Sequence, residues 1–323
     1  MSKLVTVFGG SGFVGRYVVQ RLAREGWRIR IAVRRPNQAL FLKPYGSVGQ
    51  VEPVFCNIRD DASVRQVLQG ADAVVNCVGI LKADGRNTFE AVQAEGAGRI
   101  ARLAAEAGAT RLVHLSAIGA DANSDSAYAR TKAAGEAAVQ AAFPTAVILR
   151  PSVIFGPEDE FFNRFAAMSR RWPVLPVVHG KTRFQPVYVD DVAKAVVAGI
   201  ERGAPGVYEL GGPVPEEFRT LMRQMLTIVM RKRPLVDLPV GLASLMAGTL
   251  DGVQRLTGGL VSNKTLTRDQ LRLLARDNVV SAGARGFAEL DITPQAFEAV
   301  IPEYLWPFRP TGQYARLRPS IKL

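Results

Sequence analysis

A glycine-rich segment near the N-terminus constrains the fold of this chain more than any other feature. The segment, FGGSGFVG at residues 8 to 15, follows an apolar strand-like run and opens a helical pattern. In that context Gly9 makes a tight turn, Gly12 admits a phosphate close to the backbone, and Gly15 lets the helix pack on the sheet. The helix N-terminus adds free N–H groups and a positive dipole. We therefore predict that a dinucleotide is held by Gly9, Gly10, Ser11, Gly12, Phe13, Val14 and Gly15.

Strand-like and helical patterns alternate through the first half of the chain. Stretches with apolar residues at helical spacing separate the strand-like runs, at 13–25, 61–69, 87–107 and 127–142. The alternation indicates crossover connections and a parallel sheet, whose strands are apolar throughout because helices cover both faces. The predicted fold is a Rossmann-like, doubly wound α/β sheet. Its expected strands are residues 3–9, 28–34, 51–58, 71–79, 110–117 and 145–151.

After Pro151 the elements become shorter. A strand and a helix are expected at 185–200, a strand at 206–212 and an amphipathic helix at 216–230. We predict a smaller C-terminal α/β lobe that packs directly on the first domain, because no flexible linker separates them. The last residues combine prolines with cations and predict an irregular, basic arm. The expected domains are therefore 1–151, 152–301 and 302–323.

The composition excludes several classes of protein. The chain carries 41 Lys and Arg against 29 Asp and Glu, a formal net charge of +12. This excess is spread along the chain and no nucleic-acid module accompanies it, so a solvated basic surface or an anionic partner explains it better than nucleic acid. The longest uncharged stretches, such as 238–250, fall short of the roughly 20 residues that span a bilayer. The first residues run straight into a strand pattern, so we expect no targeting peptide and a cytoplasmic protein.

Two cysteines and two histidines give no sign of a disulfide or a metal centre. Cys56 and Cys77 lie in apolar strand-like runs, and in the usual strand order these strands lie on opposite sides of the first strand. Buried free thiols in a reducing compartment are therefore expected. His114 and His179 have no partners at the spacing of metal ligands, so we interpret them as ordinary core or loop residues.

The end of the second strand indicates which dinucleotide is preferred. An acidic residue there would accept hydrogen bonds from a ribose without a 2′-phosphate. This chain has Arg34 and Arg35 instead, and two guanidinium groups favour the 2′-phosphate, so NADPH is preferred to NADH. One of the two arginines is expected to be only a solvated surface residue. Further cofactor contacts are expected at the ends of the next strands, with Asn57 and Ile58 bordering the adenine and Val78 and Gly79 beneath the ribose.

The sequence YARTK, residues 128 to 132, places Tyr128 and Lys132 one helical turn apart. An ammonium at that spacing lowers the pKa of a phenol, whose unperturbed value is about 10. Some enzymes use such a pair to make a tyrosine into a proton donor.

These motifs resemble the short-chain dehydrogenase/reductase superfamily, in particular its extended and atypical branches. The resemblance covers nearly the whole chain through GGSGFVG, NCVG, YARTK, RPSVIFGP and QPVYVDDVA. Within that superfamily the chain is similar to the nucleotide-binding accessory subunits of respiratory complex I, the proton-pumping NADH:quinone oxidoreductase. The segments that resemble this group are GFVGRYVVQRLAREG, LKPYGSVGQV, RPSVIFGPEDEFFNRF and LTRDQLRLLARDNVV. The last of these is the most telling, because cofactor binding does not require it.

The resemblance implies how the YARTK segment is used. In active relatives the tyrosine transfers a proton, while the lysine stabilises the phenolate and holds the nicotinamide ribose. Here Ala117 falls where active relatives carry Ser or Thr, with Ser116 one place early. Only eleven residues separate Ser116 from Tyr128, where extended enzymes carry a longer substrate-contacting segment. We therefore expect Ser116, Tyr128 and Lys132 to hold the ribose and nicotinamide end of NADPH, and we assign no catalytic residue.

Other features have ordinary interpretations. The run EDE at 158–160 predicts a solvated or partner-facing patch, and Asp190 and Asp191 are expected to cap the following helix. The helix at 216–231 is expected to bury an apolar face and to end in the basic sequence MRKR. The segment 238–256 is equally compatible with burial in its own lobe and with contact to a hydrophobic partner or a bilayer interface.

The features and the resemblance together predict an accessory subunit in the peripheral arm of complex I that carries NADPH as a structural ligand. Its expected partners are core subunits of complex I and a membrane surface, on the cytoplasmic side of a bacterial inner membrane. The main alternative is a free-standing NADPH-dependent reductase or epimerase that uses Tyr128, Lys132 and Ser116. A third hypothesis is a redox sensor whose partner interface depends on NADPH occupancy.

Overall fold

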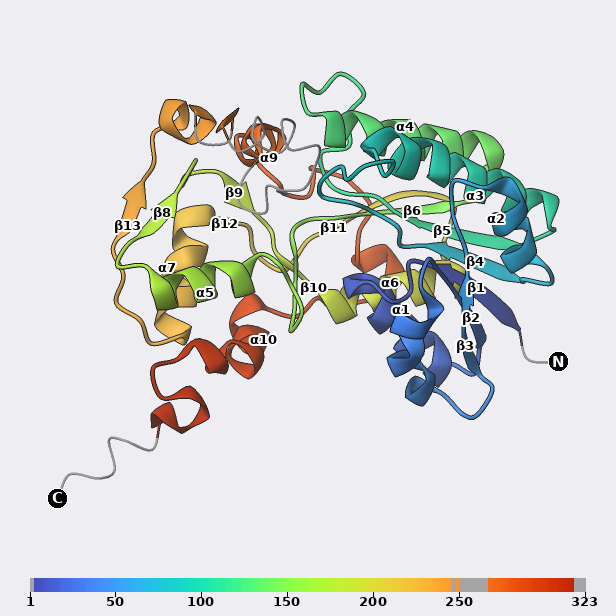
Figure 1. The fold of residues 1–323 in the computed structure, drawn as a ribbon, viewed down its shortest axis with the longest axis horizontal. Coiled ribbons are helices and arrows are strands. Elements are labelled where there is room, and N and C mark those ends of the chain that lie inside the picture. The colour runs from blue at the N-terminus through green and yellow to red at the C-terminus, as the bar shows by residue number, and fades with distance from the viewer. Residues whose placement is uncertain (1–2, 246–247, 250–266, 317–323) are drawn as a thin grey trace. The chain divides into compact units, whose positions relative to one another are not determined.

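The computed structural model describes residues 3–245, 248–249 and 267–316 and divides into two compact units (Figure 1). The units are interleaved along the chain instead of meeting at one boundary. Unit 1 comprises Met1–Pro151, Val189–Leu210 and Val280–Thr293, and unit 2 comprises Ser152–Tyr188, Gly211–Val279 and Pro294–Leu323.

Unit 1 is built on a seven-stranded sheet in which all neighbouring strands are parallel. The strand order is β11-β6-β5-β4-β1-β2-β3, so the chain starts near the middle and winds outward in both directions. The predicted doubly wound sheet is confirmed. The strands that precede Cys56 and Cys77 lie on opposite sides of β1, and both cysteines are free thiols. The strands are β1 Leu4–Phe8, β2 Arg28–Val33, β3 Val51–Phe55, β4 Ala73–Asn76, β5 Arg111–Leu115, β6 Val147–Pro151 and β11 Gly206–Leu210.

Helices cover both faces of this sheet (Figure 1). On one face, α2, α3 and α4 bury strand residues such as Phe8 and Val74 in a continuous apolar core. On the other face α1 packs against α6, and Gly199 of α6 lies so close to the sheet that a Cβ there would be 3.2 Å from Val113 and Val147. Successive strand residues face opposite helix layers, which explains why the inner strands β1 and β4 are apolar on both faces. The helices are α1 Phe13–Arg24, α2 Asp61–Leu68, α3 Glu95–Glu106, α4 Ala127–Ala142 and α6 Val189–Glu201, with a 3-10 helix η1 at Pro36–Tyr45 and a π-helical turn η2 at Glu90–Ala94.

Unit 1 extends beyond Pro151, which differs from the expected domain boundary. Strand β11 pairs in parallel with the whole of β6. Helix α6 is joined to α1 by an ion pair in which Arg21 donates from Nε and Nη2 to the carboxylate of Asp190, at 2.6 and 2.5 Å. Because pairing between distant segments leaves no local pattern, the sequence alone places the strand at 206–212 in the smaller lobe.

Asp190 and Asp191 lie in the first turn of α6, which begins at Val189. They are therefore inside the helix and not at the capping position that the sequence suggests. Asp191 is fully buried and accepts a hydrogen bond from Lys194 Nζ at 2.7 Å. Both carboxylates are favourably placed at the positive end of the helix dipole.

Unit 2 is a small α/β lobe around an aromatic core. Helices α5 (Phe162–Arg171), α7 (Phe218–Ile228) and α10 (Phe297–Tyr304) contribute to one buried cluster. The amphipathic helix predicted at 216–231 is confirmed as α7, and its expected apolar face is buried, namely Phe218, Leu221, Met222, Met225 and Val229. Three short strand pairs complete the lobe: β7 (Ile154–Phe155) with β10 (Val187–Tyr188), β9 (Arg183–Phe184) with β12 (Glu216–Glu217), and β8 (Leu175–Val177) with β13 (Leu235–Asp237).

Asn278 ties together separate segments of unit 2. Its Oδ1 accepts hydrogen bonds from Ser152 Oγ at 2.7 Å and from the backbone N–H of Val153 at 3.1 Å. Its backbone carbonyl accepts from the N–H of Gln185 at 3.1 Å. The described part of the segment 266–280, which also contains α9 (Arg268–Leu274), thus has a structural role within unit 2. This accounts for a stretch that nucleotide binding does not require.

The acidic run at 158–160 is only partly the solvated patch that the sequence suggests, because Glu158 and Glu160 are exposed and the central Asp159 is not. Asp159 is buried and accepts hydrogen bonds from Tyr304 Oη at 2.7 Å and from the N–H groups of Gly156 and Asn163 at 3.2 and 3.0 Å. Burial raises the pKa of Asp159, and these donors oppose the increase. The burying contact comes from a tyrosine 145 residues further along the chain, so a local acidic pattern cannot reveal it.

The C-terminal segment is more regular than the arm expected at 302–323. Pro302 lies inside α10, and Ile301 and Leu305 are fully buried in the core of unit 2. Two 3-10 turns follow, η4 at Trp306–Phe308 and η5 at Gly312–Arg316. Residues 317–323 lie outside the described residues.

The segment 238–256 is only partly described. Leu238 and Ala243 pack with Val178 and Leu271, so this part is held by its own unit. Leu242 and Leu245 are exposed, and the expected apolar positions Met246, Val253 and Leu256 lie outside the described residues. Within the described ranges, none of the helices has the length and apolar character needed to cross a membrane.

Candidate functional site

The glycine loop between β1 and α1 forms a tight turn. Gly9 has a φ of +75°, a left-handed conformation that glycine adopts without strain. The N–H of Gly12 donates to Gly9 O at 3.0 Å, which closes the turn. A Cβ at Gly9 would lie 3.2 Å from the backbone N and from Cγ2 of Val78. The turn expected of Gly9 is therefore present, and it lies against the end of β4.

Two further glycines keep the loop narrow. A Cβ at Gly15 would lie 2.3 Å from Gly9 O and 2.6 Å from Gly10 Cα, so α1 approaches the loop backbone itself and not only the sheet. A Cβ at Gly10 would lie 2.8 Å from Ile31 Cγ2. Gly12, at the N-terminus of α1, is exposed and provides no side-chain cap. The first N–H groups of α1 thus remain available to an anion.

Arg34 and Arg35 follow directly after β2 and are exposed. Over the described ranges, neither side chain makes a hydrogen bond or an ion pair. The end of β2 is adjacent to the glycine loop, since the N–H of Gly9 donates to Ala32 O at 3.2 Å. Arg34 and Arg35, which have no internal partners over the described ranges, therefore follow the strand end that adjoins the loop.

Another cation near the loop is not among the predicted residues. Arg16 lies in the first turn of α1, and its guanidinium carbon is 5.2 Å from the ring centroid of Phe41. Its Nε donates to Gly12 O at 3.4 Å. A cation one helical turn after a glycine loop is the sequence signal that could have identified it.

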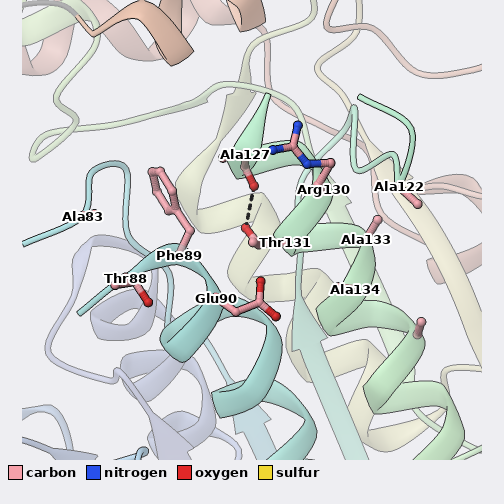
Figure 2. Close-up of a pocket in the computed structure, with 11 residues that line it drawn as sticks. Ala83, Thr88, Phe89, Glu90, Ala122, Ala127, Arg130, Thr131, Ala133 and Ala134 are labelled. Atoms are coloured by element: carbon pink, nitrogen blue, oxygen red, sulfur yellow. Dashed lines mark hydrogen bonds between the residues drawn. The ribbon is translucent and has the colours of Figure 1, made fainter. Parts of the chain in front are cut away.

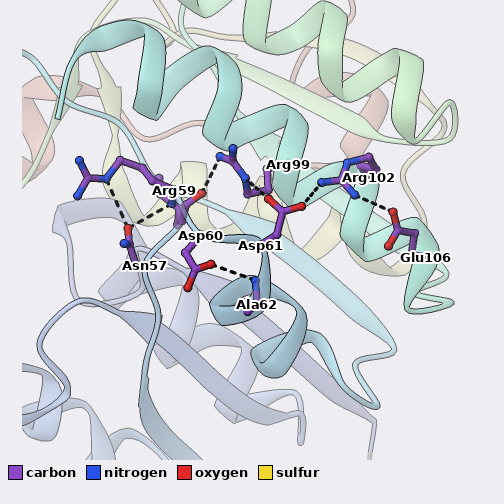
Figure 3. A network of polar contacts seen from close by, with 9 residues as sticks. Asn57, Arg59, Asp60, Asp61, Ala62, Arg99, Arg102 and Glu106 are labelled. Carbon is purple, nitrogen blue, oxygen red and sulfur yellow. Dashed lines mark hydrogen bonds and ion pairs between the residues drawn. The ribbon is translucent and has the colours of Figure 1, made fainter. Parts of the chain in front are cut away.

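The loop after β3 is fixed by arginines of α3 (Figure 3). Arg99 donates from Nε to Asp61 at 2.5 Å and from Nη1 to Ile58 O at 3.1 Å. Arg102 also donates to Asp61, and hydrogen bonds from Arg102 and Arg99 lower the pKa of that carboxyl. Asn57 Oδ1 accepts from the backbone N–H of Arg59 at 3.2 Å. Asn57 and Ile58 are thus held at the end of β3, with Arg59 as a further cation that the sequence analysis missed.

The ends of β4 and β5 meet through a buried polar pair. Asn76 and His114 are opposite each other in the sheet, with Asn76 Nδ2 3.1 Å from His114 Nδ1. Asn76 Oδ1 accepts from the N–H of Val78 at 3.0 Å, so its amide nitrogen is the donor and His114 carries its proton on Nε2. Burial lowers the pKa of His114 to about 3, and the charge of Lys132 acts in the same direction. His114 is therefore a neutral core residue that helps to position Val78.

Lys132 is buried beneath the ends of β4 and β5. Its Nζ donates to Leu115 O at 3.1 Å, and a Cβ at Gly79 would lie 3.5 Å from Nζ. Burial lowers the pKa of Lys132 to about 8, although the nearby charges of Glu136 and Cys77 act to raise it. The fold therefore brings together three of the predicted positions, the glycine loop, the end of β4 and Lys132.

Tyr128 is not activated by this lysine. Lys132 Nζ lies 6.0 Å from the centroid of the Tyr128 ring, and Phe89 packs edge-on against the same ring at 6.0 Å. Burial raises the pKa of Tyr128 to about 12. The spacing predicts that an ammonium one turn away lowers this pKa, but burial of the phenol raises it here.

Ser116 is the third member of the expected constellation. The residue is 4% exposed, and its backbone N–H donates to Leu149 O at 2.7 Å. Its Oγ is buried without a hydrogen-bond partner among the described residues. In this conformation, Ser116 does not hydrogen-bond to Tyr128.

Close packing holds α4 in position. Gly135 lies so near to η2 that a Cβ there would be 2.1 Å from Gln93 O. Gln93 Oε1 accepts from Thr131 Oγ1 at 3.2 Å, and its Nε2 donates to Ile80 O at 2.6 Å. The helix that carries Tyr128 and Lys132 is thereby fixed to the segment after β4.

A cavity of about 590 Å³ lies along another side of α4 (Figure 2). Phe89, Glu90, Arg130, Thr131 and several alanines line it. Its described lining includes none of the residues predicted to bind the cofactor. The volume of this cavity is therefore not evidence for the nucleotide site, which rests on the glycine loop and the strand ends.

A model of the NAD dependent epimerase/dehydratase family matches residues 5–211. The matched span contains the glycine loop, Arg34, Arg35 and the YARTK segment. The chain belongs to the NAD dependent epimerase/dehydratase family. Membership supports binding of a nucleotide cofactor, and the narrow loop with its exposed Gly12 fits one.

Two relatives of this chain carry names that describe different functions, one a subunit of a dehydrogenase complex and the other a reductase. The chain is 34% identical over 316 residues to "NADH dehydrogenase [ubiquinone] 1 alpha subcomplex subunit 9, mitochondrial" of Arabidopsis thaliana, with 96% of this chain and 79% of the relative covered. It is 33% identical over 238 residues to "Ceramide reductase" of Caulobacter vibrioides, with 73% and 74% covered. The structure resembles UDP-glucose 4-epimerase of Thermotoga maritima with a TM-score of 0.68 at 16% identity, over 93% and 98% of the two chains. The last comparison supports the fold alone.

Proposed function

We propose that this family member is an accessory subunit of a proton-pumping NADH:quinone oxidoreductase and that it holds NADPH without turning it over. The observation that carries the proposal is the state of Ser116, whose hydroxyl is buried without a partner beside an otherwise well-formed nucleotide loop. The complex I subunit of Arabidopsis, which is similar over 96% of this chain, supports the same assignment.

NADPH is the proposed ligand because of the charges after β2. The exposed guanidinium groups of Arg34 and Arg35 have no competing carboxylate partner in the described part of the chain. A 2′-phosphate would receive charge-assisted hydrogen bonds from them, whereas a ribose hydroxyl would leave both cations without a partner. Ser11, Phe13 and Val14 complete the loop around the pyrophosphate in this proposal. Asn57 and Ile58 border the adenine, and Val78 and Gly79 lie beneath the ribose.

The residues proposed to lie around the nicotinamide end favour binding of NADPH over its oxidation. In an active relative, bound NADPH would supply a hydride to the substrate. Here, a phenol with a pKa of about 12 is a weak acid, and Lys132 is engaged by Leu115 O in place of the phenolate. Below pH 8 the buried Lys132 is charged, and its remaining N–H donors would hold the ribose hydroxyls. We therefore assign Tyr128 and Lys132 to positioning.

A ligand held in this way has a structural effect. Any molecule that binds only the folded state stabilises that state, by an amount that grows with the logarithm of the ratio of free ligand to Kd. NADPH would join the loop after β1, the end of β2 and the end of β4, which are separate in sequence. The proposed role of the cofactor is therefore to stiffen unit 1 so that it presents a defined surface to its partners.

The proposed partners are core subunits of the oxidoreductase, with the chain bound peripherally on the cytoplasmic side of a bacterial inner membrane. Native mass spectrometry of membranes solubilised in mild detergent tests partners and ligand together. We expect the chain to be found in a complex with the oxidoreductase subunits, together with one NADPH. An oxidoreductase that is intact and active but lacks this chain would contradict the proposal.

A free-standing NADPH-dependent reductase is the second candidate, because a relative named as a reductase is 33% identical over 73% of the chain. That function requires a change of conformation that exposes Ser116 Oγ. Steady oxidation of NADPH by the purified chain with a carbonyl substrate, abolished in Tyr128→Phe, would establish it. Under the structural proposal, the purified chain does not oxidise NADPH, and Tyr128→Phe weakens NADPH binding through the lost positioning contact without changing any turnover.

A further inference from the structure

Unit 2 carries a surface groove of about 770 Å³ with a strongly cationic lining. The groove lies along one face of α7, from its first turn to its C-terminal end, and along the segment that leads from it into β13. This segment includes the MRKR sequence at 230–233, to which the proposed function gives no role. Five cationic side chains and, within the described residues, no carboxylate line the groove; the cations are Arg219, Arg223, Arg231, Lys232 and Arg233.

Most of these cations are not neutralised by the protein. Arg219 forms an ion pair with Asp237. In the part of the chain that is described, Arg223, Arg231, Lys232 and Arg233 have no ion pair with a carboxylate. The helix dipole at the end of α7 supplies only about half a negative charge. A dipole of that size cannot balance four unpaired cations, so the groove retains a net positive charge.

Two of the arginines are held in fixed positions. Arg231 Nε donates to Phe308 O at 2.7 Å, and Arg233 Nε donates to Ser169 O at 2.9 Å. Their terminal Nη groups make no hydrogen bond to the described protein and remain available to a ligand. Burial lowers the pKa of Arg231, and the charges of Arg233 and Arg170 act in the same direction. An anion in the groove would relieve this repulsion and would find guanidinium groups that are already ordered.

Exposed apolar side chains accompany the charges. Met230, which lines the groove, is 44% exposed, and Val236 in β13 is 45% exposed. Trp172 is 47% exposed at the end of α5, the helix whose Ser169 carbonyl holds Arg233. A soluble phosphate compound would use the cations but would leave these side chains in water. An anionic membrane surface offers phosphate groups and an apolar layer together.

We propose that this groove binds the phosphate headgroups of anionic phospholipids, with Met230, Val236 and Trp172 reaching the edge of the apolar layer. The inference goes beyond the proposed function, because the purified chain should bind such a membrane without any partner subunit. Each cation close to an anionic bilayer changes binding by a factor of roughly five. Removal of two groove cations should therefore weaken binding by about 10- to 30-fold.

The test is sedimentation of the full-length chain with vesicles of phosphatidylcholine alone or with 30% phosphatidylglycerol, at about 0.15 M salt. The groove variant is Arg223→Gln with Lys232→Gln, because neither side chain has a partner within the described residues and the fold should be unaffected. The matched control is Arg24→Gln with Arg28→Gln, which removes the same charge from exposed positions of unit 1. We expect binding to the anionic vesicles only, a 10- to 30-fold loss in the groove variant, and a change below threefold in the control.

Three results would overturn the inference. One is the absence of binding to anionic vesicles, and another is an equal loss in the control variant, which would indicate that net charge alone is responsible. The third concerns an acidic protein as the ligand. If poly-glutamate at the same concentration of negative charge displaces the chain from the vesicles completely, the groove is better explained as a site for an acidic protein than as a site for lipid. A blue shift of tryptophan emission on vesicle binding, absent in Trp172→Phe, would support the lipid.

Discussion

Replacement of Arg34 and Arg35 by glutamine tests the cofactor assignment most directly. Both side chains are exposed and make no hydrogen bond or ion pair with the described protein, so their removal leaves no buried group unsatisfied. The free energy of unfolding without ligand should therefore change by less than about 0.5 kcal/mol. Any larger effect on nucleotide binding can then be attributed to the lost guanidinium groups.

The expected magnitude follows from their exposure. A hydrogen bond between charged groups contributes about 1.5–3 kcal/mol, and solvent screening at an exposed site favours the lower end of that range. Two such contacts to a 2′-phosphate give about 2–3 kcal/mol, which is a 30- to 150-fold increase in the Kd for NADPH. The Kd for NADH should rise less than threefold, because NADH carries no phosphate at that position.

Isothermal titration calorimetry with both nucleotides at 0.15 M salt provides the measurement. The pair Arg24→Gln and Arg28→Gln is the control for general electrostatic attraction. Thermal unfolding gives a second readout, since NADPH at 100 times its Kd stabilises the folded state by about 2.7 kcal/mol. If the double glutamine variant loses NADPH and NADH affinity by the same factor, the arginines do not read the 2′-phosphate and the assignment is refuted.

Three other outcomes are expected from single features of unit 1. Gly15→Ala should destabilise the protein by about 2–4 kcal/mol in urea unfolding, because its Cβ meets the loop backbone at 2.3 Å, whereas Gly26→Ala, with φ +77° and open space around it, should cost only about 1 kcal/mol; equal costs would contradict the close approach. Ser116→Ala should be neutral or stabilising because its Oγ has no partner in the described protein, whereas Thr6→Val should cost about 1 kcal/mol through the lost bond to Val67 O; a large loss in Ser116→Ala would show that its hydroxyl is used. For Lys132, the pKa falls from 10.5 in the unfolded chain to about 8 in the folded state, so between these values the unfolded chain binds more protons and the free energy of unfolding should increase with pH; Lys132→Met should lack this increase, and an identical pH profile in both proteins would disprove the shift.

The sheet of unit 1 was largely predictable because each strand has its own local signal. The runs at β1 to β6 are mostly apolar over four to six residues, and the helices between them show their own spacing, so element types follow from short windows of sequence. Gly9 was also predictable, since a turn of that kind between a strand and a helix requires a positive φ. The local sequence is therefore sufficient to predict the strands, the helices between them and the turn at Gly9.

The remaining features depend on contacts between distant residues. Strand β11 has an ordinary strand pattern, but its pairing with β6 is decided by the geometry of the whole sheet. Asp159 looks solvated in sequence and is buried by Tyr304. The direction of the Tyr128 pKa shift depends on how far the phenol is desolvated, which the spacing to Lys132 does not determine. In each case the type of element or residue can be read from the local sequence, but the contacts around it come from residues far along the chain.

The contact of Gly135 with Gln93 has a consequence for how the YARTK segment should be interpreted. At Gly135, α4 lies too close to η2 to leave room for a methyl group, so the helix cannot slide or rotate along its neighbour. The side chains that α4 carries therefore keep their positions whether or not a reaction depends on them. The neighbouring turn η2 also supports the segment after β4, because Gln93 donates to Ile80 O. The places of Tyr128 and Lys132 are therefore set by the packing of α4, and they do not by themselves indicate that the protein performs a reaction.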